Sequence, residues 1–356
     1  MTQTDPQLVQ VREEHRFDEQ QLAEYLGRVL PDDFPDGFEI RQFEGGQSNP
    51  TFLLENESGR YVLRKKPPGK LLPSAHLVER EYQVMAALGN TPVPVPDALH
   101  LCEDESIIGT PFYVMRYVSG RVFDQPDLDG ADPGEREAIY NAMVDTLAEL
   151  HNVDYEAVGL GEFGKVGEYI PRQIRLWTKQ YDAARTDEIP AMDKLIEWLP
   201  NNIPEGDETT IAHGDFRPGN IMMHPEESRV VAVLDWELCT LGHPLTDLAY
   251  FCISYHLPPD NPGMRGLEGK DLTGLGIPDE EAVVQRYCQR TGRDSIPHWP
   301  FYTAFALFRL AAILQGVYKR GLDGNASSSN ALEMGRGARV LAEAGWKEAE
   351  KLESRK

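Results

Sequence analysis

An aspartate and an asparagine stand five positions apart a little beyond the middle of the chain. Asp215 and Asn220 both belong to the run His-Gly-Asp-Phe-Arg-Pro-Gly-Asn, residues 213–220. Its glycines and proline disfavour a helix, so both polar side chains can converge on one point. A second carboxylate, Asp235, closes the apolar run Val-Val-Ala-Val-Leu that starts at Val230. A carboxylate at the end of such a β-strand is well placed to project into a cleft.

These residue types together suit phosphoryl transfer. Asn220 and Asp235 offer hard oxygen ligands for Mg²⁺, which neutralises phosphate charge. Asp215 can orient an acceptor hydroxyl and accept its proton. We therefore predict Asp215 as catalytic base, Asn220 and Asp235 as metal ligands, and ATP with Mg²⁺ as cofactors. The spacing from Asp to Asn equals that of the protein-kinase loop H-R-D-x-x-x-x-N, and Arg217 is predicted to contact the γ-phosphate.

The loop at 213–220 and the Leu-Asp-Trp-Glu segment at 234–237 carry a resemblance to a known family. With them the chain resembles the aminoglycoside phosphotransferase family, which shares the protein-kinase-like fold and includes relatives of choline kinase. The resemblance extends over about residues 30 to 340, and the run from Tyr61 to His76 is similar to kinase-like domains fused to acyl-CoA dehydrogenases. It implies a small-molecule kinase whose hydroxyl-bearing acceptor is aminoglycoside-like, choline-like, an amino sugar or hydroxyacyl-CoA-like.

The resemblance also assigns residues to ATP binding. A turn after the first strand would cover the phosphates with backbone N–H groups; its residues are Gly45, Gly46, Gln47, Ser48 and Asn49. Tyr-Val-Leu-Arg at 61–64 aligns with the kinase V-A-I-K, so Arg64 would hold the α- and β-phosphates, whereas Lys65 faces the opposite side of the strand. Glu81, in the following helix, would pair with Arg64. Glu79 is the alternative partner of Arg64, because helical phase alone does not decide which of the two glutamates faces it.

Two further segments match the family. Phe112–Val118 resembles the last strand and hinge of a kinase small lobe. Backbone groups around Arg116 and Val118 would then bind adenine, with Met115 at the back of the pocket. Asp247 resembles the family aspartate that braces the catalytic loop from a following helix; an ordinary acid near a helix N-terminus is the alternative.

The pattern of apolar residues predicts the elements that position these groups. A helix is expected at Phe17–Leu30 and another at Ala75–Leu88. Period-two runs predict strands at Glu39–Phe43, Thr51–Glu55, Arg60–Lys65, Val93–Leu101 and Pro111–Val118. Helical spacing then dominates at 135–151, 169–185, 192–203, 279–291, 298–320 and 327–352, interrupted by a strand at Arg229–Asp235 and by a long Pro- and Gly-rich loop at 257–278.

We therefore expect an α+β, bilobal, protein-kinase-like fold. Residues 1–15 are predicted to be a flexible N-terminus. Residues 16–118 would form a nucleotide-binding lobe with a five-stranded antiparallel sheet plus helix. Residues 119–356 would form a large, mainly helical lobe for catalysis and substrate binding.

Composition narrows the partners. The 356 residues carry a formal net charge of −23, which argues against nucleic acid and against an anionic membrane surface. The charge fits either solubility or attraction of a cationic substrate. The four cysteines form no C-x-x-C pair, and neither a signal peptide nor an uninterrupted membrane span is expected. We predict a cytoplasmic protein, and its oligomeric state is not readable from sequence.

Two other functions would use the same residues differently. A catalytically silent kinase fold that only binds nucleotide would typically lack the base or a metal ligand, whereas Asp215, Asn220 and Asp235 are all retained. A metal-dependent hydrolase would use histidines such as His213 and His243 with these aspartates, but their spacing matches no familiar zinc pattern.

Overall fold

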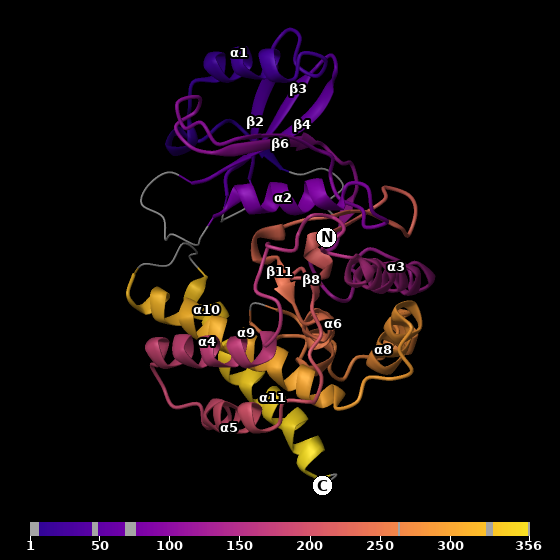
Figure 1. The fold of residues 1–356 in the computed structure, drawn as a ribbon. Coiled ribbons are helices and arrows are strands. Elements are labelled where there is room, and N and C mark those ends of the chain that lie inside the picture. Colours follow the sequence, from indigo (N-terminus) through magenta and orange to yellow (C-terminus); the bar gives the residue numbers. More distant parts are fainter. Residues whose placement is uncertain (1–6, 45–48, 68–75, 263, 325–329, 355–356) are drawn as a thin grey trace. The chain divides into compact units, whose positions relative to one another are not determined.

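The computed structural model describes residues 7–44, 49–67, 76–262, 264–324 and 330–354 (Figure 1). Contacts divide the chain into two compact units. The amino-terminal unit comprises Gln3–Val122 and Met222–Cys239, and the helical unit comprises Phe123–Ile221 and Thr240–Lys356. The α+β class is confirmed: an antiparallel sheet comes first and a mainly helical part follows. Each unit is described by itself.

The amino-terminal unit is built on one antiparallel sheet with the strand order β1-β2-β3-β4-β6-β5. Its strands are β1 (Leu8–Val9), β2 (Glu39–Phe43), β3 (Thr51–Asn56), β4 (Gly59–Lys65), β5 (Ala98–Cys102) and β6 (Phe112–Arg116). The five predicted strands are present. A sixth, β1, pairs Leu8 with Phe43 and Val9 with Gln42, so the prediction that residues 1–15 are wholly flexible was wrong at this strand. Two residues are too few to show a period.

Alternation along the strands separates a core face from a site face. The core face packs against α1 (Glu19–Val29), which Asp18 caps through the Gln21 amide at 2.9 Å. The other face carries α2 (Val78–Leu88), and Figure 1 shows the sheet between the two helices. The core face and α1 contribute Leu22, Leu26, Phe52, Leu54, Tyr61, Leu63, Phe112 and Val114. Because side chains alternate, Arg64 and its cross-strand partners Thr51 and Tyr113 lie on the side of α2.

The segment Met222–Cys239 packs with the amino-terminal unit although it lies a hundred residues further along the chain. It contributes β10 (Val230–Val233) and most of β9 (Ile221–Met223), which pairs with β7 (Arg121–Val122) in a small sheet. The Val233 amide also donates to the Pro94 carbonyl at 2.8 Å. From the sequence, this segment is expected in the helical lobe of residues 119–356. Nonlocal pairing with β7, which no local pattern encodes, assigns it to the other unit.

The helical unit surrounds the long helix α9 (Trp299–Leu322), against which α4, α6, α10 and α11 pack. By length and average composition α9 could cross a membrane, but 78% of its apolar stretch is buried, as in the core helix of a folded unit. The other helices of the helical unit are α3 (Pro133–Asn152), α4 (Tyr169–Ala184), α5 (Pro190–Trp198), α6 (Pro244–Cys252), α7 (Leu272–Leu275), α8 (Glu280–Thr291), α10 (Ala331–Gly335) and α11 (Gly337–Glu353).

Sequence patterns missed several short elements of the helical unit. Strands β8 (Thr210–Ala212) and β11 (Thr240–Gly242) pair with each other, and each is too short for a period. The single helix expected at 327–352 is instead α10 and α11, with Arg336 between them. Gly335 allows the close approach of α9 there, since a Cβ at this position would lie 2.3 Å from the Tyr318 Cβ.

Candidate active site

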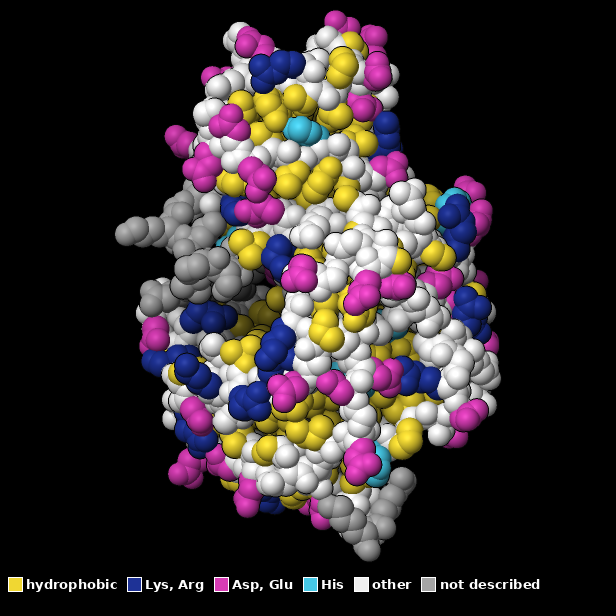
Figure 2. Space-filling model, in the orientation of Figure 1, with side chains coloured by type: hydrophobic (Ala, Val, Ile, Leu, Met, Phe, Trp, Pro, Cys, Tyr) yellow, Lys and Arg dark blue, Asp and Glu magenta, His cyan; other side chains and the backbone are white. Residues whose placement is uncertain are grey.

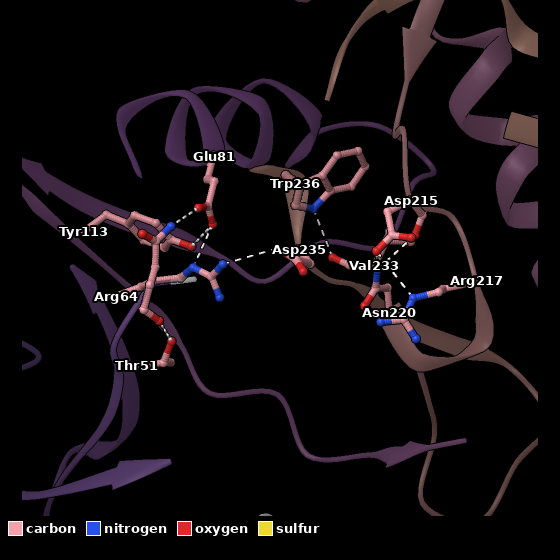
Figure 3. Close-up of polar contacts among 11 residues, drawn as sticks. Thr51, Arg64, Glu81, Tyr113, Asp215, Arg217, Asn220, Val233, Asp235 and Trp236 are labelled. Carbon is pink, nitrogen blue, oxygen red and sulfur yellow. Dashed lines mark hydrogen bonds and ion pairs between the residues drawn. The ribbon is translucent and has the colours of Figure 1, made fainter. Parts of the chain in front are cut away.

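The predicted base, Asp215, lies in the loop after β8 and holds hydrogen bonds on both carboxylate oxygens. Its Oδ1 accepts from the Tyr250 hydroxyl at 2.6 Å. Its Oδ2 accepts from Asn220 Nδ2 at 2.8 Å and lies 3.4 Å from Arg217 Nε (Figure 3). The three predicted residues of this loop therefore meet directly within the helical unit, and a fourth group, Tyr250, was not anticipated.

The contacts of Asn220 decide how its amide is oriented. Nδ2 donates to the Asp215 backbone carbonyl at 2.9 Å as well as to the carboxylate. Both partners are acceptors, so the nitrogen must face them and the carbonyl oxygen must point away. In the described part of the chain no hydrogen bond reaches that oxygen. It has the chemistry of a Mg²⁺ ligand.

Asp247 braces the catalytic loop from α6. Its carboxylate is fully buried and accepts the backbone N–H groups of His213 at 2.6 Å and of Gly214 at 2.9 Å. Burial alone would raise its pKa, but hydrogen bonding from His151, whose Nε2 lies 3.4 Å away, and these backbone contacts hold the pKa of Asp247 below its ordinary value. Gly214 has a φ of +85°, which explains glycine where protein kinases carry arginine.

Arg309 of α9 holds the same loop from its carbonyl side. Its NH2 donates to the Gly214 carbonyl at 3.0 Å, and its guanidinium lies 5.9 Å from the centre of the Trp177 ring. From the sequence, Arg309 is expected only as one of several basic residues that could bind the phosphates of an acyl-CoA acceptor, and not at this loop. No sequence spacing could have placed it there, because α9 begins at Trp299, far along the chain from the loop at 213–220.

In the amino-terminal unit, Arg64 lies between two carboxylates (Figure 3). Its Nε is 2.9 Å from Glu81 Oε2, and its NH2 is 3.2 Å from Asp235 Oδ1. Although burial opposes the charge, the acidic groups around it raise the pKa of Arg64 above its ordinary value. Glu81 also accepts from the Tyr113 hydroxyl at 3.0 Å. Tyr113 was not predicted, but it is the cross-strand neighbour of Arg64 and could have been found from strand register.

The two alternatives left open by the sequence separate in the structure. Glu79 pairs with Lys66, so it is not the partner of Arg64. Lys65 is buried on the core face with its Nζ 5.6 Å from the centre of the Phe17 ring, and burial lowers its pKa. The Arg64–Glu81 pair is therefore the one that the fold assembles, while its role toward phosphates stays a prediction.

The predicted phosphate-covering turn is only partly described. Gly45, Gly46, Gln47 and Ser48 lie outside the described residues. Asn49 is fully buried, and its Nδ2 donates to Glu81 Oε1 at 2.8 Å. The Asn49 side chain therefore supports the Glu81 carboxylate rather than extending over a ligand.

Asp235 occupies a strained backbone position. Its φ of 62° and ψ of 65° are left-handed, which costs a residue with a side chain about 1 kcal/mol or more and often marks functional sites. The buried Trp236 secures the turn by donating from Nε1 to the Val233 carbonyl at 3.0 Å. Arg64 engages one Asp235 oxygen and leaves the other for a cation.

The donor set fits Mg²⁺ better than a metal held by protein alone. Among the described residues no group of three His, Cys, Asp or Glu side chains could hold a metal ion. Mg²⁺ characteristically takes one or two protein oxygens and completes its shell with water and substrate phosphates. Asn220 and Asp235 each offer one such oxygen within its own unit, and the described residues give the zinc-hydrolase interpretation no support.

The predicted adenine hinge needs one correction. The backbone N–H of Arg116 donates to the Asp97 carbonyl at 2.9 Å, and its side chain pairs with Asp33 at 3.0 Å. The backbone N–H of Arg116 is thus already hydrogen-bonded within the unit and is not available to bind adenine. Met115 is half-buried at the end of β6, and Val118 follows the strand; their roles toward adenine stay predictions.

Comparison with known proteins gives a consistent assignment. Residues 39–300 match the APH phosphotransferase enzyme family. The chain is 51% identical to acyl-CoA dehydrogenase family member 10 of Mus musculus, over 94% of this chain and 31% of that protein. It is 45% identical to acyl-CoA dehydrogenase family member 11 of Homo sapiens, over 95% of this chain and 44% of that protein. The chain thus spans less than half the length of these relatives.

Solved structures agree on the fold. A Ralstonia eutropha protein assigned to the aminoglycoside phosphotransferases superposes with a TM-score of 0.87 at 50% identity, covering 94% of this chain and 99% of that one. Aminoglycoside phosphotransferase APH(4)-Ia, in complex with AMP-PNP and hygromycin B, gives a TM-score of 0.60 at 15% identity over 93% and 98%; this second likeness concerns the fold alone. From the family match and the identities near one half, the chain belongs to the APH phosphotransferase enzyme family.

Proposed function

We propose that the chain transfers the γ-phosphoryl group of ATP to a hydroxyl of a small molecule in the presence of Mg²⁺. The arrangement of Asp215 and Asn220 carries this proposal. One amide orients the carboxylate through its nitrogen at 2.8 Å and keeps its oxygen for a metal. A silent fold has no need for that arrangement. Mg²⁺, when bound with ATP, supplies the charge that offsets the phosphates.

Each unit contributes its own part to the proposed reaction. Arg64 is held in place by Glu81 and presents a planar fork suited to phosphate oxygens. Asp215 orients the acceptor hydroxyl and accepts its proton, and Arg217 offsets charge on the transferred group. Positioning and electrostatics supply most of the rate enhancement in such transfers. The ion pair of Arg64 with Glu81 and the hydrogen bonds to Asp215 supply that positioning in each unit.

We favour a hydroxyacyl-CoA-like acceptor over an aminoglycoside-like or choline-like one. The curated relatives at 51% and 45% identity carry acyl-CoA dehydrogenase names, which supports this choice. The Ralstonia eutropha protein at 50% identity is assigned to the aminoglycoside phosphotransferases, so aminoglycosides stay in the panel of acceptors. A phosphate-bearing acceptor also needs cations. Figure 2 shows Lys and Arg side chains gathered on the face where α4 and α10 lie. The exposed basic residues of α4, of the end of α9 and of the start of α11 with the residue before it include Arg175, Lys179, Arg320, Arg336 and Arg339.

One cavity of the helical unit has suitable chemistry for an anion. It has a volume of about 240 Å³ and is lined by Arg336, Arg339, Gln315 and Tyr318, with Asp187 as an acidic member. Arg339 already donates to the Glu188 carbonyl at 2.8 Å, so Arg336 is the cation that could turn to a ligand.

The test is ADP release from MgATP with a panel of acceptors: aminoglycosides, choline, amino sugars and hydroxyacyl-CoAs. Asp215→Ala is the control and should lower kcat by at least ~10²-fold, as expected for loss of a general base, without loss of ATP binding. A compound whose phosphorylation disappears in the variant identifies the acceptor class. ATP binding with no turnover on any acceptor would favour the silent nucleotide-binding fold, and equal turnover by the variant would overturn the assignment of Asp215.

A further inference from the structure

Of the hydrogen bonds to the Asp215 carboxylate among the described residues, the one from the Tyr250 hydroxyl is the shortest. The distance to Oδ1 is 2.6 Å, against 2.8 Å from Asn220 and 3.4 Å from Arg217 to Oδ2. Asn220 and Arg217 belong to the same loop as Asp215 and move with it. Tyr250 comes from a different element, so it is the contact that relates the carboxylate to the rest of the helical unit.

Helix α6 holds the catalytic loop at two levels. Asp247 and Tyr250 are three positions apart on it, and residues at this spacing share one face of a helix. Asp247 accepts the N–H groups of His213 and Gly214, which determines the course of the backbone. Tyr250 then binds the side chain that follows immediately, that of Asp215. The same face of α6 therefore holds both the backbone of the loop and the carboxylate of Asp215.

The hydroxyl can act only as a donor to this carboxylate. Burial, and next the negative charge of Asp215, raise the pKa of Tyr250 well above its ordinary value. The phenol therefore remains protonated throughout the range in which the protein would work. An aspartate carboxylate has a broad, roughly two-fold torsion about its last bond. A donor fixed on a helix restricts that rotation.

Resting on the proposed function, we propose that Tyr250 is a positioning residue for Asp215: its hydrogen bond to Oδ1 holds the carboxylate in the orientation that meets the acceptor hydroxyl. Tyr250 supplies no proton and contacts no phosphate in this role. Its loss should lower kcat and leave ATP binding unchanged.

The primary experiment compares Tyr250→Phe with Tyr255→Phe. Tyr255 is a matched control, because its hydroxyl also makes a short hydrogen bond, 2.7 Å to the Pro278 carbonyl, in the neighbouring helical turn. ADP release from MgATP is measured with water as acceptor and with whichever panel compound raises it. Hydrogen bonds to charged groups predict a fall in kcat of about 10- to 100-fold for Tyr250→Phe. KM for ATP should stay within about two-fold, and Tyr255→Phe should keep the kcat of the unsubstituted chain.

A double-mutant cycle separates positioning from general loss of structure. Tyr250→Phe is combined with Asp215→Asn, and kcat and Tm are measured for both single variants and the pair. If Tyr250 acts through Asp215, the second substitution costs no further activity, and the Tm changes are not additive. Additive effects, or equal losses from Tyr250→Phe and Tyr255→Phe, would overturn the positioning role.

The outcomes also distinguish this inference from the proposed function. An inactive Asp215→Ala beside a fully active Tyr250→Phe would reject the role of Tyr250 and keep the kinase. An Asp215→Ala variant as active as the unsubstituted chain would reject the kinase assignment. In that case the Tm cycle still reports whether the Tyr250–Asp215 contact exists in solution.

Discussion

The amino-terminal unit and the helical unit secure their charged residues by different means. Arg64 and Tyr113 are cross-strand neighbours, and Glu81 comes from the next helix along the chain. The Asp215 loop is held instead by α6 through Asp247 and by α9 through Arg309. The first site depends mainly on register between neighbouring strands, whereas the second depends on helices distant in sequence. Changes in the first should thus act on ATP binding, and changes in the second on turnover and on the stability of the helical unit.

The largest effect is expected from Asp247→Ala. It removes a buried carboxylate and leaves the N–H groups of His213 and Gly214 without their acceptor. We expect the free energy of unfolding to fall by about 4 kcal/mol, measured by urea denaturation. Asp193→Ala, which breaks a surface pair with Arg185, should cost less than ~1 kcal/mol. Similar losses in both variants would contradict a bracing role for Asp247.

Glu81→Ala should have the next largest effect, and Glu79→Ala is its matched control. Loss of Glu81 removes one of the two carboxylates that flank the largely buried Arg64 guanidinium, which we expect to cost about 3 kcal/mol in unfolding free energy and to raise KM for ATP at least ~10-fold. Among the residues that the structure describes, Glu79 pairs with Lys66 alone, at a part-exposed position, so its loss should change either quantity little. A larger rise in KM with Glu79→Ala would mean that the wrong carboxylate has been paired with Arg64.

His256 gives the helical unit a pH dependence of its own. Burial disfavours its charge, but contacts of 2.9 Å to Glu280 and 3.1 Å to Glu348 prevail and raise the pKa of His256 to about 9. Because the folded value lies above the unfolded value of about 6.5, this stabilisation is complete below that pH. It should be lost as pH rises toward about 9, by on the order of 2–3 kcal/mol.

Unfolding free energies at pH 6 and pH 9 check this expectation. His256→Gln should flatten the difference between the two pH values. An unchanged slope in the variant would assign the pH dependence to other groups.

The smallest effect is expected from Lys65→Met. Lys65 is buried against Phe17 on the core face, so an apolar side chain of similar length should alter stability by less than ~1 kcal/mol. KM for ATP should stay within about two-fold, whereas Arg64→Met should raise it at least ~10-fold. A rise in KM with Lys65→Met would show that the two basic residues share the phosphates, and would weaken the contrast between the sheet faces.

Local patterns predicted the amino-terminal unit well. Strand β2 has the expected bounds, Glu39–Phe43. Alternation along β4 predicted from the sequence that Arg64 and Lys65 lie on opposite faces of the sheet. Prediction was poorer where elements are short or pairing is nonlocal: β1, β8 and β11 have two or three residues each. Such strands exist only because a distant partner supplies their hydrogen bonds.

The sequence by itself determined which residues could do chemistry and which family the chain resembles. Asp215, Asn220 and Asp235, with their spacing and the strand before Asp235, were enough to predict phosphoryl transfer and the family. Tertiary structure decided how those groups are held. The pairing of Glu81 rather than Glu79, the commitment of the Arg116 amide to Asp97 and the contact of Tyr250 with Asp215 depend on which faces meet. Composition and period define a face, but only packing selects what lies against it.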